Sequence, residues 1–150
     1  MSDGGSLYED FHLWTQQQAE FIGNQQWHKL DWLNLREEID EMGRREKRSI
    51  ESNLVVLLLH LLKWEHQPTF RSSSWRGSIK EQRRRLRKDL QDSPSLAAYA
   101  EEQLAECYDS SRTLASGETG LDEQSFPESC PYKLEQLLQI DFWPQSSIPR

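Results

Sequence analysis

The chain has 150 residues, which is the length of one typical domain and enough to bury roughly 70% of the unfolded surface in a single core. Its formal net charge is −7 and its isoelectric point is near 5.1. General affinity for nucleic acid or for anionic membranes needs a net positive field, so the overall charge argues against both and leaves only a local basic patch as a candidate.

Neither the start of the chain nor its cysteines indicate export. The first ten residues, MSDGGSLYED, lack the basic and apolar segments of a secretory signal. The longest apolar run, LVVLLLHLLKW at residues 54–64, has about half of the ~20 residues that a bilayer-spanning helix needs. Two cysteines, Cys107 and Cys130, are too few for a disulfide framework or a zinc cluster. We therefore expect a soluble cytoplasmic protein without a membrane partner.

The spacing of apolar residues is helical along almost the whole chain, and no segment alternates apolar and polar residues as a strand would. This pattern predicts an all-α fold, a compact single-domain bundle of five to six helices over residues 8–143. The termini, residues 1–7 and 144–150, are expected to be disordered tails.

The first two helices are predicted from their end signals. The first covers about residues 8–23, where Gly23 and Asn24 form a plausible stop. Asp31 can cap the second helix. The apolar stripe of this second helix, which we expect to be buried, is formed by Trp32, Leu35, Ile39 and Met42.

Gly43 leaves two possibilities, a continuous helix or a hairpin. One helix over residues 31–66 would be roughly 54 Å long, against a diameter of about 38 Å for a compact domain of this size. We therefore predict a break at Gly43. The pair of Glu41 and Arg45 argues for the opposite, because it has favourable i,i+4 spacing only if the helix continues.

The remaining helices follow in order. The third ends before Pro68, because the residue preceding a proline avoids helical dihedrals. The fourth has a thin apolar stripe and many cationic residues, which indicates a peripheral helix. The fifth starts at Ser93 and Pro94 and closes at Gly117 and Gly120. A short last helix covers YKLEQLLQ, and DFWP is expected to fold back on the body.

Several segments stand in an order that matches a known family: LREEIDEMG, VVLLLHLLKWEHQP, RSSSW, DSPSL, ETGL and FPESCPYKLEQLL. Together they closely resemble the cyanobacteria-rich family called "domain of unknown function 29", over about residues 8–143. The resemblance implies a compact, soluble, all-helical bacterial protein. It supplies no activity and no functional residues, so every chemical role must come from this sequence itself.

His60 stands in the most apolar run of the chain. At intervals of seven residues, Glu46, Asn53, His60 and Gln67 form a polar line on one flank of the helix. We therefore interpret His60 as a residue at a helix seam with one bonded nitrogen. In the hairpin register His28 would lie level with His60. The alternative hypothesis is therefore a metal-binding protein or metal-dependent hydrolase with zinc or another divalent metal at His28 and His60, although zinc prefers three or four protein ligands.

Two further groups of residues have weaker functional interpretations. Carboxylates at positions 38, 41, 106 and 109 faintly resemble a magnesium site on two helices, but they are expected to point outward as solvated acidic faces. Cys107 is interpreted as an inert buried thiol, and Cys130 as a residue at a helix start.

The fourth helix carries the run KEQRRRLRKDL, whose cations could follow phosphates, with Phe70 and Trp75 as stacking faces. Nucleic-acid binding through residues 76–88 is therefore a further alternative. Solvation, or neutralisation by the acidic second helix, is the commoner role of such a run.

No catalytic constellation emerges, and acidic and basic residues are segregated along the chain. The sequence therefore favours a non-catalytic interaction or regulatory module with no cofactor, leaning away from an enzyme, whose partner is another protein. The docking region is expected at residues 69–75 and along the basic helix. Its candidate partner-binding residues are Arg71, Trp75, Arg76, Lys80, Arg84 and Arg87.

Overall fold

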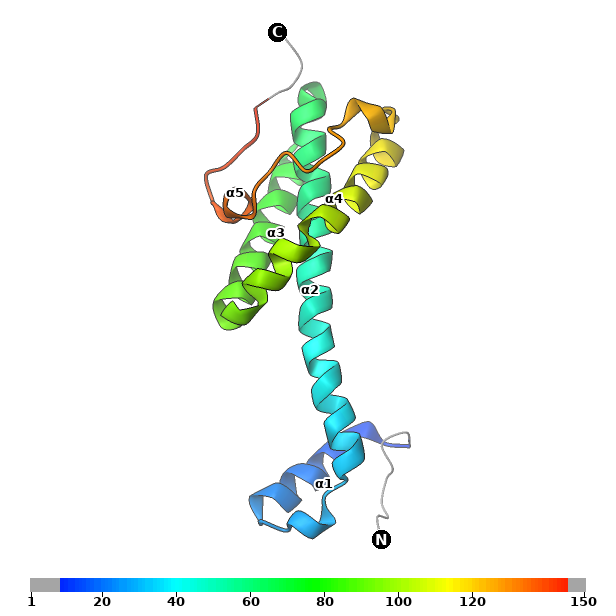
Figure 1. The fold of residues 1–150 in the computed structure, drawn as a ribbon, viewed down its shortest axis with the longest axis vertical. Helices are drawn as coiled ribbons and strands as arrows, with labels where there is room; N and C mark the ends of the chain where they lie inside the picture. Colours follow the sequence, from blue (N-terminus) through cyan, green and yellow to red (C-terminus); the bar gives the residue numbers. More distant parts are fainter. Residues whose placement is uncertain (1–8, 146–150) are drawn as a thin grey trace. The chain divides into compact units, whose positions relative to one another are not determined.

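The computed structural model describes residues 9–145 (Figure 1). Within this range the chain forms five α-helices and no strand, so the all-α prediction is confirmed. No helix of the described range has both the length and the hydropathy that crossing a bilayer requires. The helices are α1 (Phe11–Gly23), α2 (Trp32–His66), α3 (Ser73–Asp92), α4 (Ala97–Thr119) and α5 (Leu134–Leu138).

The chain divides into two units with separate internal packing, an N-terminal unit (Met1–Arg45) and a C-terminal unit (Glu46–Arg150). The predicted tails, residues 1–7 and 144–150, lie almost entirely outside the described residues, and the prediction of a single domain over residues 8–143 stays a prediction. Helix α2 contributes its first part to the N-terminal unit and the rest to the C-terminal unit.

The predicted hairpin at Gly43 is wrong, because α2 is one helix of 35 residues from Trp32 to His66. A helix-interior glycine costs only about 1 kcal/mol relative to alanine. Around it, Glu41 forms ion pairs with Arg44 at 3.0 Å and with Arg45 at 3.8 Å, contacts that only a continuous helix allows. The argument from length failed because it assumed that the whole chain packs around one core.

The C-terminal unit contains the hydrophobic core. Residues of α2 between Ile50 and Trp64 pack with apolar side chains of α3, α4, α5 and the segment between α4 and α5. The fully buried members include Leu54, Leu57, Leu58, Leu61, Leu62, Ile79, Leu86, Tyr108 and Leu137. In Figure 1, α3 and α4 lie along this part of α2.

Polar contacts fix how these helices meet. Asp89 on α3 accepts hydrogen bonds from Ser49 at 2.8 Å and from Asn53 at 3.2 Å. On α4, the Ser111 hydroxyl donates to the carbonyl of Val55 at 2.8 Å. Of the predicted polar line on α2, Asn53 bonds to α3, and Glu46 accepts a hydrogen bond from the hydroxyl of Ser93 at 3.2 Å just after α3.

Arg83 holds the C-terminal segment on α3. Its side chain is almost fully buried, its Nε donates to the carbonyl of Leu137 at 2.7 Å, and its Nη1 donates to that of Ile140 at 3.2 Å. Its guanidinium also lies 6.0 Å from the ring of Trp143, which packs 4.8 Å from the ring of Trp64. The charge therefore satisfies orphan carbonyls at the end of α5, where a helix leaves its last acceptors unpaired.

Hydrogen bonds to Asp31 hold α1 against the start of α2 in the N-terminal unit. The Asp31 carboxylate accepts hydrogen bonds from Trp14 Nε1 at 3.0 Å and from Asn34 Nδ2 at 2.8 Å, and its backbone N–H donates to Gln18 at 2.8 Å. The bond from Asn34, more than the bond from Trp14, holds the Asp31 pKa below its ordinary value against the opposing effect of burial. Trp14 and Leu30 are the buried apolar side chains of this unit among the described residues.

Gly43→Ala should stabilise the protein by up to about 1 kcal/mol, because alanine has the higher helix propensity and an added Cβ meets no atom within 4 Å. The matched control is Gly120→Ala at the end of α4, where φ is +77°. It should cost about 1 kcal/mol, since this backbone conformation disfavours a side chain. Urea unfolding followed by circular dichroism measures both, and a destabilised Gly43→Ala would contradict the continuous helix.

Arg83→Met should lower the free energy of unfolding by about 2 to 4 kcal/mol. It keeps the aliphatic volume but removes the donor of the buried carbonyl of Leu137 and that of the part-buried carbonyl of Ile140. Arg84→Met on the same helix is the control, since Arg84 is exposed and, among the residues that the structure describes, bonds only to Glu81. Equal losses in the two variants would show that the buried bonds of Arg83 contribute nothing special to the fold.

Candidate functional site

Large apolar side chains are exposed on the N-terminal unit. The exposed fraction is 61% for Trp32, 65% for Ile39 and 59% for Met42 on α2, and it is 51% for Trp27 and 47% for Ile22 before this helix. The predicted burial of the stripe is therefore wrong for Trp32, Ile39 and Met42, whereas Leu35 is half-buried. That stripe needed the second half of a hairpin to cover it, and the hairpin does not exist.

All of these side chains except Met42 border one groove, which we call the N-terminal groove. It has a volume of about 440 Å³, and α2 forms one wall while the end of α1 and the turn after it form the other. Its lining residues are Ile22, Trp27, Leu30, Trp32, Leu35, Arg36, Ile39 and Asp40. Six of the eight are apolar, and the two charged residues lie on one flank of the α2 stripe, as their spacing of four predicts.

Most of the predicted partner-binding cations contact other parts of the chain. Arg71 donates through Nε to the carbonyl of Trp64 at 2.8 Å, and its guanidinium lies 4.7 Å from the Trp64 ring. Arg76 lies over the same ring at 5.6 Å, and Lys63 lies over the ring of Trp75 at 4.8 Å. The structure therefore brings Arg71, Trp75 and Arg76 together around the end of α2, in contacts that stabilise the fold.

The basic run of α3 is neutralised within its own helix and not by α2. Glu81 pairs with Arg84 at 2.7 Å and with Arg85 at 2.9 Å, and these hydrogen bonds lower the pKa of Glu81 to about 2. Lys88 pairs with Asp92 at 2.9 Å, and Arg87 donates to the carbonyl of Leu138. Lys80 is exposed. Few of these cations are left to follow a phosphate backbone.

His60 bonds within its own helix. Its Nδ1 lies 2.8 Å from the carbonyl oxygen of Val56, and because a carbonyl only accepts, Nδ1 carries the proton. The expected single bonded nitrogen is thus present. The register that brought His28 level with His60 is lost with the hairpin, and no group of three or more potential ligands lies together within residues 9–145.

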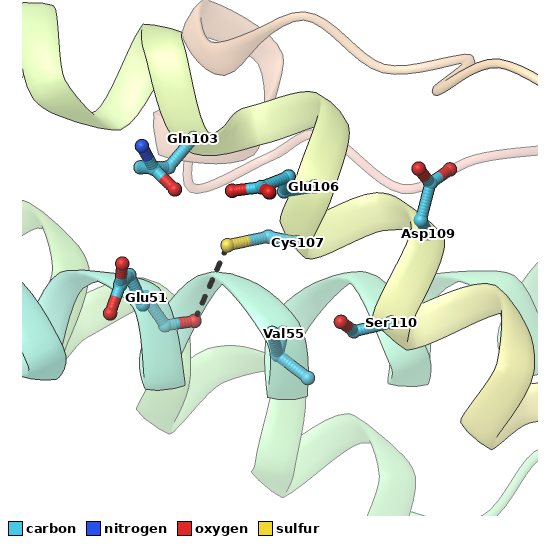
Figure 2. Close-up of a pocket in the computed structure, with 7 residues that line it drawn as sticks. All are labelled: Glu51, Val55, Gln103, Glu106, Cys107, Asp109 and Ser110. Carbon is cyan, nitrogen blue, oxygen red and sulfur yellow. Dashed lines mark hydrogen bonds between the residues drawn. The ribbon is translucent and has the colours of Figure 1, made fainter.

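Figure 2 shows a depression between α2 and α4 that contains Cys107 and three carboxylates, those of Glu51, Glu106 and Asp109. The thiol is buried and donates to the backbone carbonyl of Glu51 at 3.7 Å. Burial, and then the charges of Glu51 and Glu106, raise the Cys107 pKa to about 11. A thiol protonated at neutral pH is a poor nucleophile, which agrees with its interpretation as an inert core residue.

A family model matches residues 7–143, and its description is "Domain of unknown function DUF29". The chain belongs to this family. No curated protein and no solved structure matches the chain. The resemblance found in the sequence is thereby confirmed, and the chemistry of the site has to be argued from the residues of this chain.

Sequence reasoning missed two features that the residue pattern signals. Arg83 stands at a position of the apolar stripe of α3, four residues after Ile79 and three before Leu86, where a cation is expected only if it is bonded internally. The groove was missed because the apolar stripe of α2 was assigned to the core of a hairpin, and because Trp27 lies between the predicted helices.

The free energy of unfolding should fall as the pH rises above 9. The pKa of Cys107 is raised from its ordinary 9.0 to about 11 and that of Tyr108 from 10.0 to about 12, in both cases chiefly by burial. The folded state thus keeps these protons while the unfolded state releases them, so stability is complete below the ordinary values and is lost above them. Urea titrations at a series of alkaline pH values measure this, and Cys107→Ala should reduce the loss between pH 9 and pH 11. A stability that rises over this range would contradict the assignment.

Proposed function

We propose that the chain is a non-catalytic protein-binding module, and that the N-terminal groove binds an amphipathic helix. The observation that carries this proposal is the imbalance within the N-terminal unit. Its described part buries Trp14 and Leu30 while it exposes a larger set of apolar side chains around one groove. Apolar anchors three or four residues apart are the usual means by which a groove receives a helix.

The amount of exposed apolar surface supports a binding role. A large side chain has an area of roughly 200 Å². The four exposed side chains that line the groove, together with Met42 further along α2, therefore present on the order of 500 Å². The largest patch on an ordinary monomer measures roughly 300–600 Å² and often has a function. Burial of one such side chain stabilises a complex by about 1.5 to 3 kcal/mol.

The other candidate functions have less support. The metal site at His28 and His60 has lost the hairpin on which it depended. Of the seven cations in residues 76–88, three pair within α3, and Arg83 and Arg87 donate to backbone carbonyls. In the docking region at residues 69–75, Arg71 already contacts Trp64 and Trp75 already contacts Lys63. A cytoplasmic location remains part of the proposal, supported by two free thiols.

Ile39→Glu should abolish binding of the partner, because it places a charge at the centre of the groove. The matched control is Leu33→Glu on the same helix. Leu33 is 80% exposed but lies roughly 120° around the helix from Ile39 and does not line the groove. Both variants should keep the native circular dichroism, since surface substitutions usually change stability by about 0.5 kcal/mol or less.

The measurement is affinity purification from the native host with each of the three proteins as bait, followed by mass spectrometry. A specific partner is retained by the native chain and by Leu33→Glu and is lost with Ile39→Glu. If no captured protein, the chain's own second copy included, depends on Ile39, the proposed function is wrong.

A further inference from the structure

The exposed stripe of α2 is a short heptad pattern. Trp32, Leu35, Ile39 and Met42 follow one another at intervals of three, four and three residues, which is the spacing with which two helices pack side by side. The stripe can therefore act both as one wall of the groove and as the apolar face of a helix that enters the groove of another molecule. A surface with both properties can bind a second copy of itself in an isologous contact.

The stripe is also symmetric about one point. Leu35 and Ile39 lie two residues on either side of Glu37, and Trp32 and Met42 lie five residues on either side. Suppose that two copies of α2 pack antiparallel through their stripes, with a two-fold axis at the level of Glu37 along the helix. Leu35 of one copy then lies opposite Ile39 of the other, and Trp32 lies opposite Met42. All four stripe positions then meet apolar partners in the second copy.

Charge complementarity selects the same register. Arg36 and Asp40 lie on the same flank of the stripe and both line the groove. A two-fold axis perpendicular to the helices keeps each flank on its own side, so Arg36 faces the flank of the second copy that carries Asp40. The two residues differ in level by roughly 3 Å at 1.5 Å per residue, which an arginine side chain spans. No ion pair joins either residue to another described residue, so both charges are available.

We propose that the N-terminal groove is the interface of a homodimer, in which the α2 stripes of two copies pack antiparallel and Arg36 of each copy pairs with Asp40 of the other. This inference rests on the proposed function and names its partner as a second copy of this chain. Each copy contributes on the order of 500 Å² of apolar surface, so the pair approaches the roughly 1,000 Å² that a specific interface requires.

Size provides an independent reason for a second copy. Segments of about 40 residues seldom form a stable core by themselves and use disulfides, metals or oligomerisation instead. The described part of the N-terminal unit has no cysteine and no cluster of metal ligands. Of these three means, oligomerisation is the one left for the described part of the unit. The proposed interface would bury apolar side chains that the unit leaves exposed.

Charge reversal tests the register with the full-length chain. Sedimentation equilibrium at low salt should give a dimer for the native protein and for Leu33→Glu, and a monomer for Ile39→Glu. Arg36→Asp alone and Asp40→Arg alone should each weaken dimerisation on the order of tenfold, because both symmetry-related ion pairs become repulsive. The double variant should recover the native affinity to within about threefold, because it restores both pairs with reversed sign.

An equimolar mixture of Arg36→Asp and Asp40→Arg gives the most specific test of the proposed ion pairs. One variant carries two acidic residues and the other two basic residues on the flank, so they should form a heterodimer of nearly native affinity although neither dimerises well alone. A partner other than a second copy cannot produce this rescue. Failure of the mixture and of the double variant to recover, or a dimer that the single reversals leave unchanged, overturns the proposal.

The outcomes also separate this inference from the proposed function. A native chain that remains monomeric at the highest attainable concentration overturns the homodimer. If such a monomer still captures another protein in a manner that depends on Ile39, the groove binds a different helix and the proposed function stands. If neither self-association nor capture depends on Ile39, both are wrong.

Discussion

The continuity of α2 through Gly43 is the constraint on which the rest of the structure depends. The second part of the helix is buried in the C-terminal unit and supplies its core from Ile50 to Trp64. The first part carries an apolar stripe of the same chemical character, but the helix does not turn back to cover it. The same helix thus has a buried apolar face in its second part and an exposed apolar face in its first part, and the exposed face forms one wall of the N-terminal groove.

Polar residues determine how each unit is fastened. In the C-terminal unit, Asp89 and Ser111 join α3 and α4 to α2, and Arg83 secures the carbonyls that follow α5. In the N-terminal unit, Asp31 ties α1 to the start of α2 through Trp14 and Gln18. These bonds have a direction, so they specify which faces meet, whereas apolar burial supplies most of the free energy without a preferred geometry.

The cationic residues of α3 show that a run of positive charges in the sequence need not form a positively charged surface. The run of α3 has the composition of a phosphate-binding patch, yet Arg84 and Arg85 bond to Glu81, and Arg83 is buried. Arginine is suited to such internal roles, since its planar fork donates to several carbonyls or carboxylates at once. The flank of the groove carries fewer charges, but Arg36 and Asp40 form no ion pair with another residue of the range 9–145, which suits them to recognition of another molecule.

The sequence by itself determined the helical fold and most helix ends, because these depend on local chemistry. Pro68 stops α2, Ser72 caps α3 by accepting a hydrogen bond from Trp75 N, and Gly120 ends α4 with a positive φ. Only the tertiary structure decided whether α2 breaks at Gly43, because a glycine costs little in a helix and ion pairs of Glu41 offset that cost. It also decided which apolar stripe is covered, since periodicity marks a face for burial but does not say whether the same chain or another molecule buries it.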